Sequence, residues 1–266
     1  MIRGKDVNFL RVKNVNKSGA EIHSKDNAGG SVLHTAVGKE NLSVVKYLIE
    51  TGAGITSKNN RGSTVLHIAV DKNNLSLVKY LIESGAEINS KDNAGRTVLH
   101  IAVGKDNLPL MKFLIASGAV INSKDNAGRT VLHIAVGKDN LPLMKLLIAS
   151  GADINSKVNA GSTVLHTAVG KENLSAVKYL IETGAVITSK DNCGRTVLHI
   201  AVDKENLSLV KYLIESGAKI NSKDNTGRTV LHIGIECSEV GCSASPAGDC
   251  FFLLLLNYRR HFVQKI

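Results

Sequence analysis

Histidine is the residue whose type and spacing most strongly suggest chemistry in this chain of 266 residues. Seven of the nine histidines recur every 33 residues, each closing a TVLH or SVLH segment: His34, His67, His100, His133, His166, His199 and His232. Evenly spaced imidazoles suggest a row of metal ligands, because neutral imidazole binds zinc and related ions. The identical surroundings of every copy point instead to a repeated structural position.

The cysteines near the C-terminus offer a second candidate metal site. Cys237, Cys242 and Cys250 lie near one another in the sequence, with His232 and His261 as additional candidate ligands. Only the spacing from Cys237 to Cys242 matches the close pairs of zinc sites, which favours free thiols of a cytosolic protein. We expect no metal and no cofactor, and the sequence leaves a role for these cysteines open.

Catalytic groups are not gathered at any one place in the sequence. A nucleophile needs a neighbouring base and an orienting group. The serines, histidines and aspartates of the array instead recur at equivalent positions. The sequence also contains no phosphate-binding G-x-x-x-x-G-K-[ST] loop. These observations predict that the protein is not an enzyme.

A unit of 33 residues carries the histidines and repeats along the chain. A fixed period of this length is typical of solenoids, in which neighbouring units bury one another's apolar faces. We expect a decayed N-terminal half repeat or cap (1–24), six repeats (25–57, 58–90, 91–123, 124–156, 157–189 and 190–222), a partial seventh repeat (223–235) and a non-repeat tail (236–266). The copies are nearly identical, so few positions distinguish one repeat from another.

The copy at residues 91–123 shows how one unit is built. A turn opens it, where Gly95 can adopt the positive φ that a tight turn requires, and Thr97 can cap a first helix. Asn107 tolerates the left-handed conformation of a hairpin, a second helix opens at Pro109, and Gly118 ends it. One unit is therefore predicted to be turn, helix, hairpin, helix and loop.

This arrangement resembles the ankyrin repeat. The resemblance rests on the 33-residue register, on G-x-T-V-L-H-I-A (Gly95 to Ala102) and on G-A-x-I-N (Gly118 to Asn122). Val98 stands where the family favours Pro, and Asp106-Asn107 replaces the family's Gly-His; neither change should disturb the fold. The resemblance implies an all-α ankyrin-repeat solenoid of helix-turn-helix units joined by hairpin loops.

The resemblance also gives the histidines a role, because each imidazole of the family hydrogen-bonds backbone near the turns. Stacked ankyrin layers lie roughly 10 Å apart, whereas zinc–nitrogen bonds measure ~2 Å, so imidazoles of different repeats could not share an ion. We therefore interpret the seven histidines as structural.

A partner-binding surface is a further implication of the resemblance, since turn tips and first helices line the concave face of ankyrin arrays. The candidates are an arginine after the turn glycine and an isoleucine after the histidine: Arg96, Arg129, Arg195, Arg228, Ile68, Ile101, Ile134 and Ile200. Arginine and apolar side chains that lose water dominate interface energetics. Alternatively, the isoleucines pack between repeats and the arginines are solvated.

The charge of the chain suggests an alternative function. The formal net charge is +10, and lysines recur at three positions per repeat, as at Lys91, Lys105 and Lys112. A basic binder of nucleic acid or of an anionic membrane surface is therefore the alternative. Acidic residues interleave with the lysines, and no aromatic residues are expected among them to stack bases, so nucleic acid is the less favoured partner.

The ends of the chain depart from the repeat. The apolar segment 251–256 is far shorter than the ~20 residues that span a bilayer, so no transmembrane segment is expected. It could cap the last repeat or dock on a membrane or partner. Secretion is not indicated, because the N-terminus lacks the apolar core of a signal peptide.

These features together predict a monomeric scaffold that binds a protein partner without catalysis. The expected compartment is the cytoplasm, with the nucleus as the alternative. A further alternative is that the chain is a fragment of a longer multidomain ankyrin protein whose activity lies elsewhere.

Overall fold

The computed structural model describes the backbone of residues 21–240 and the side chains of residues 21–235. Most of the predicted N-terminal cap lies outside the described residues, as does the apolar segment 251–256. The chain divides into two compact units, the first ending at Asn126 and the second beginning at Ala127.

The described residues form thirteen helices, and their only β-structure is two isolated bridges, Lys25–Ser31 and Lys157–Thr163. The first unit contains α2 (Val32–Gly38), α3 (Leu42–Glu50), α4 (Val65–Asp71), α5 (Leu75–Glu83), α6 (Val98–Val103) and α7 (Leu108–Ala116). The second contains α8 (Val131–Gly137), α9 (Leu141–Ala149), α10 (Val164–Gly170), α11 (Leu174–Glu182), α12 (Val197–Asp203), α13 (Leu207–Glu215) and α14 (Val230–Val240). The all-α prediction is confirmed.

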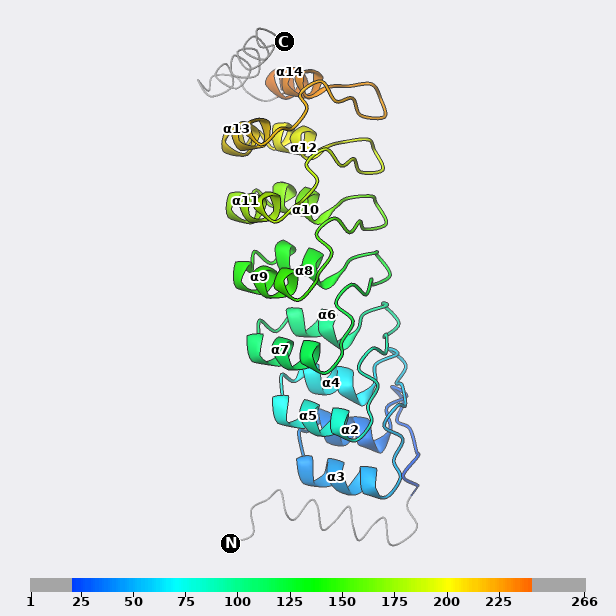
Figure 1. Ribbon diagram of the computed structural model, residues 1–266. Helices are drawn as coiled ribbons and strands as arrows, with labels where there is room; N and C mark the ends of the chain where they lie inside the picture. Colours follow the sequence, from blue (N-terminus) through cyan, green and yellow to red (C-terminus); the bar gives the residue numbers. More distant parts are fainter. Residues whose placement is uncertain (1–20, 241–266) are drawn as a thin grey trace. The chain divides into compact units, whose positions relative to one another are not determined.

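Helices pack in pairs within each unit, and the pairs stack on one another. In the first unit α4 packs against its own partner α5 and against the first helices α2 and α6 of its neighbours. In the second unit α10 contacts α8 and α12, and α12 contacts α14. Figure 1 shows that within each unit the turns that precede the first helices project on the same side.

The first helices are short because their sequence supplies a cap at one end and a turn at the other. Thr64 precedes α4 with extended backbone, and its hydroxyl accepts the backbone N–H of His67. Leu66, Ala69 and Val70 are fully buried. The small side chain of Ala69 suits a layer in which neighbouring first helices approach closely.

The connection between the two helices differs by one residue from the prediction. The left-handed residue is Asp106, with φ of 53°, and not Asn107. Asn107 instead caps α7, its side-chain oxygen accepting the N–H of Leu110. Because α7 begins at Leu108, Pro109 occupies its second position and not the first. Capping by Asn107 satisfies a helix N–H that no helical carbonyl can reach.

The last helix, α14, is longer than the other first helices. It spans 11 residues, against 7 for α12 before it. It continues past Ile235, where the partial seventh repeat was predicted to end. In the part of the chain that the structure describes, no helix has both the length and the apolarity needed to cross a bilayer.

Candidate partner-binding site

In several repeats a buried histidine joins its own turn to the following one. In α4 the Nδ1 of His67 accepts the backbone N–H of Thr64 at 3.2 Å and lies 2.8 Å from the Thr64 hydroxyl. Its Nε2 lies 3.1 Å from the backbone oxygen of Arg96 in the next repeat. Since Nδ1 accepts, the proton is on Nε2, which donates to that oxygen.

The same bridge recurs in both units: His34 reaches the carbonyl of Ser63, His166 that of Arg195 and His199 that of Arg228. Burial lowers the pKa of all four imidazoles, although the hydrogen bond to the next turn opposes it. They are therefore neutral near pH 7. His232 differs, because its side chain is exposed.

The described residues contain no group of histidine, cysteine, aspartate or glutamate side chains arranged to hold a metal ion. Cys242, Cys250 and His261 of the second candidate lie outside these residues, as does the side chain of Cys237. Cys193 is a free, exposed thiol at a turn.

Backbone hydrogen bonds between successive turns fix the positions of the turn tips. The N–H of Asn93 donates to the carbonyl of Arg61 at 3.0 Å, and its side-chain amide donates to the carbonyl of Asn60 at 2.9 Å. Gly62 leaves room for this contact, because a Cβ there would lie 2.6 Å from the backbone nitrogen of Asn93. The turn tips of the first unit are therefore held in register.

The predicted arginine of the third repeat is held by an ion pair within its own turn. Nε and Nη2 of Arg96 donate to Oδ2 of Asp92 at 2.9 and 2.8 Å. Burial of the Asp92 carboxylate raises its pKa, but the hydrogen bonds from the Arg96 side chain and backbone outweigh this and lower it. Arg96 still has a half-exposed side chain. The arginine is thus oriented by its turn, which the sequence reasoning did not foresee.

The equivalent arginines of the second unit include two with the same contact. Arg195 pairs with Asp191 at 3.1 Å and Arg228 with Asp224 at 3.2 Å. Arg129 is exposed at its turn. The predicted isoleucines Ile68, Ile101, Ile134 and Ile200 are all half-buried. Each therefore packs partly against its own layer and keeps part of its surface available.

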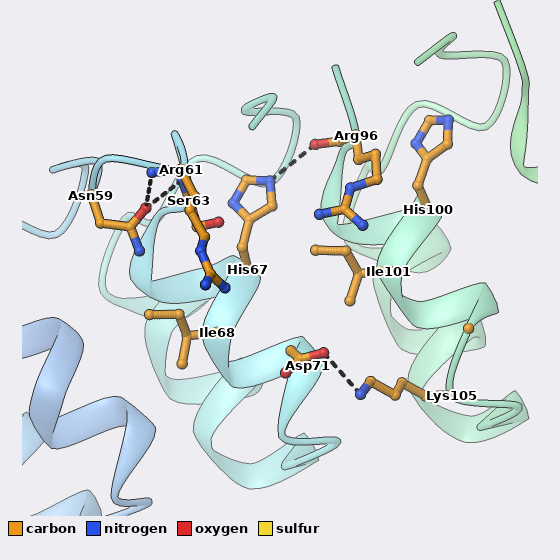
Figure 2. A pocket seen from close by; sticks show the side chains of 11 residues that line it. Asn59, Arg61, Ser63, His67, Ile68, Asp71, Arg96, His100, Ile101 and Lys105 are labelled. Atoms are coloured by element: carbon orange, nitrogen blue, oxygen red, sulfur yellow. Dashed lines mark hydrogen bonds and ion pairs between the residues drawn. The ribbon is translucent and has the colours of Figure 1, made fainter. Parts of the chain in front are cut away.

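A hollow in the first unit brings three of the predicted residues together (Figure 2). It has a volume of about 500 Å³ and lies over the first helices α4 and α6 and the turns before them. Its lining consists of Asn59, Arg61, Ser63, His67, Ile68, Asp71, Arg96, His100, Ile101, Gly104 and Lys105. Ile68, Ile101 and Arg96 belong to this set, whereas the other candidates lie in the second unit.

Arg61 and Asp71 are lining residues that the sequence reasoning missed. A signal for Arg61 was present, because it is the only arginine at this turn position: the other copies have Ala28, Ala94, Ala127, Ala160, Cys193 and Thr226. Asp71 forms an ion pair with Lys105 at 2.8 Å. The charges of this pair cancel at the wall of the hollow.

Lysines elsewhere on the repeats also have structural partners. Lys58 donates from Nζ to the carbonyl of Lys91 at 2.7 Å, and Lys91 repeats the contact one turn later. On the second helices, lysines lie over the aromatic ring of the next repeat at 5.3 to 5.6 Å from its centroid: Lys46 over Tyr80, Lys79 over Phe113, Lys145 over Tyr179 and Lys178 over Tyr212.

The expectation that no aromatic residues lie among the lysines is therefore wrong. The lysine and the ring that contact each other are 34 positions apart in the sequence, as in Lys46 and Tyr80, and only stacking of the repeats brings them together. These rings are covered by lysines of the same protein. They support the stack and are not open platforms for bases.

Comparison with known proteins agrees with this architecture. The model of ankyrin repeats in three copies matches residues 5–92, 90–158, 139–224 and 165–244. Among solved structures, the ankyrin repeat domain of Bcl-3, described as a unique member of the IkappaB protein family, is similar with a TM-score of 0.71. Sequence identity to it is 29%, over 85% of this chain and 99% of that chain. A comparison with curated proteins gives no match. With its stacked helix pairs, its histidine bridges between turns and these family matches, the chain belongs to the ankyrin repeat family.

Proposed function

We propose that this protein is a non-catalytic scaffold that binds a protein partner through the turn tips and first helices of its repeats, the concave face of the ankyrin arrangement. The single observation that carries the proposal is the hollow over α4 and α6, where Ile68 and Ile101 keep apolar surface available beside oriented polar groups. Apolar surface flanked by arginine is the composition of an interface hot spot.

Rigidity supports this function. Asn93 bonds the preceding turn through backbone and side chain, and His67 bonds the following one. A surface held in this way loses little conformational entropy when a partner binds, so contacts of modest strength suffice. The likeness to the ankyrin repeat domain of Bcl-3 supports a module of similar extent.

Absence of catalysis is supported by the state of His67, the imidazole in the wall of the hollow whose contacts are described above. Both ring nitrogens of His67 are engaged with Thr64 and Arg96, which leaves neither as a base for a nucleophile. The exposed free thiol of Cys193 supports a reducing compartment, such as the cytoplasm or nucleus.

The test is capture of proteins from a nuclease-treated cell lysate on the immobilised chain, washed at low and then high salt. The variant Ile68→Thr/Arg96→Ser/Ile101→Thr changes the face with residues that other copies already carry, as at Ser162 and Thr167. The control is Val120→Asp, because Val120 is exposed away from the hollow and the next repeat has Asp153 there.

A discrete protein that survives high salt, binds the control and is lost with the triple variant is the expected result. Retention that is equal for the triple variant and the control would place binding elsewhere and contradict the proposal. Retention of nucleic acid alone in an untreated lysate, lost steeply with salt, would favour the electrostatic alternative.

A further inference from the structure

Arg61 is the one cation of the hollow that the described residues leave uncompensated. Its backbone N–H is bound by Asn59, whose side-chain oxygen accepts it at 3.0 Å. Its guanidinium makes no hydrogen bond or ion pair to any residue that the structure describes, and Figure 2 shows it extending from the turn toward the first helix. By contrast, Arg96 is paired with Asp92, and Lys105 with Asp71. The hollow therefore has a net positive charge, located at Arg61.

Arg96 adds directed donors to this charge. A guanidinium has five N–H groups, and Asp92 accepts from Nε and Nη2 alone. The remaining N–H groups are held in a fixed orientation on a half-exposed side chain. A ligand carboxylate that accepts from them would not have to order the arginine first, which lowers the entropic cost of binding.

The rest of the lining restricts what this charge can bind. Ile68 and Ile101 present aliphatic surface between the arginines and the Asp71–Lys105 pair, and the lining contains no aromatic ring except the histidines. His67 is neutral near pH 7, because burial lowers its pKa, and its Nε2 is bound to the backbone of Arg96. The anion-binding groups are thus the two arginines.

We infer that the hollow binds an acidic segment of a protein partner, with a carboxylate at Arg61 and Arg96 and an adjacent aliphatic side chain against Ile68 and Ile101. This inference rests on the proposed function and specifies the chemistry of the partner. A nucleic-acid strand fits less well, because bases would find no open aromatic platform and successive phosphates would approach the carboxylate of Asp71.

The chain provides folded variants for the test. Arg61→Ala gives the second repeat the alanine that four other turns already have, at Ala28, Ala94, Ala127 and Ala160. Ile68→Thr reproduces Thr35 and Thr167. The matched control is Lys219→Val, which removes one positive charge from an exposed position outside the turn tips and first helices, where two other repeats have Val120 and Val186.

The experiment is selection of a phage-displayed library of random twelve-residue peptides on the full chain. The enriched peptides are then synthesised and titrated against wild type, Arg61→Ala, Ile68→Thr/Ile101→Thr and Lys219→Val. We expect Asp or Glu next to Leu, Ile or Val in the enriched sequences. Arg61→Ala should weaken them about tenfold or more, as expected for one charge-assisted hydrogen bond. The same peptides with Asp or Glu replaced by the amide should lose this dependence on Arg61.

Each other outcome overturns a defined part of the argument. The enriched peptides could lack acidic residues, bind Arg61→Ala as tightly as wild type and fail to bind Ile68→Thr/Ile101→Thr. That result would refute the carboxylate site and leave the proposed function standing. No enriched peptide, or peptides indifferent to both variants, would contradict the carboxylate site and the use of this hollow together. Displacement of the peptides by a short single-stranded oligonucleotide that also needs Arg61 would reassign the site to phosphate.

Discussion

His67 donates a hydrogen bond from Nε2 to the backbone oxygen of Arg96, 3.1 Å away in the following repeat. The His67 side chain, which contacts the turn of its own repeat, is therefore anchored on the backbone of the next turn. Arg96, whose backbone oxygen it binds, also contributes its guanidinium to the hollow. Stability of the stack and geometry of the candidate site depend on the same contact.

Replacing His67 by alanine should lower the free energy of unfolding by about 2 to 4 kcal/mol, since a cavity forms and buried backbone groups of Thr64 and Arg96 lose their partner. Urea denaturation measures the change. The control is His232→Ala, which should cost less than about 1 kcal/mol because His232 is exposed. Equal losses for the two variants would contradict the bridge. Metal content measured on the purified chain should be the same for both.

As pH falls, the protein should begin to lose stability at a higher pH than titration of its carboxylates would cause. Burial lowers the pKa of His34, His67, His166 and His199 from the ordinary 6.5. As pH falls through 6.5 the unfolded chain takes up protons that the folded chain does not. Stability is therefore full above this pH and falls below it, by up to about 1.4 kcal/mol per pH unit for each imidazole.

Urea midpoints between about pH 7.5 and 5, roughly the range in which histidine titrates, measure how steeply stability falls with pH. His67→Asn should make the slope shallower, because it removes one buried imidazole whose pKa is lowered. A midpoint independent of pH in the wild type over this range would disprove the linkage.

Two glycines separate the effect of backbone conformation from that of crowding. Gly62 and Gly85 have φ of 72° and 92°. Added methyl groups would meet the backbone nitrogen of Asn93 at 2.6 Å in the first case and no atom within 4 Å in the second. We expect Gly85→Ala to cost about 1 kcal/mol from strain alone, and Gly62→Ala to cost about 3 kcal/mol. Thermal denaturation compares them, and equal costs would show that contact between the turns adds nothing.

The left-handed residue between the helices allows a stabilising substitution. Glu172 has φ of 58°, as does Asn73 at the same place in another repeat. Each side chain accepts a hydrogen bond from the capping asparagine of the next repeat, Asn206 or Asn107. Glu172→Asn should keep this bond and raise stability by about 0.5 kcal/mol, because asparagine tolerates this conformation better. Glu172→Gln should give no gain; a gain equal to that of asparagine would argue against relief of strain.

Local features of the repeat were predictable where a single residue type controls them. Gly95 has the expected positive φ, Thr97 precedes its helix with extended backbone and the residues after it are helical. The error at Asp106 arose because Asn107 suits both a left-handed position and a helix cap, and the sequence pattern does not separate these roles.

By itself, the sequence determined the repeat, its helices and its family. A 33-residue period with caps and glycines at fixed places depends on interactions within a single repeat. The tertiary structure decided the contacts between repeats: Lys46 over Tyr80, His67 on the backbone of Arg96 and the hollow that gathers Arg61, Ile68 and Ile101. Each of these contacts joins two successive repeats, which meet only because each layer buries its apolar side chains against the next.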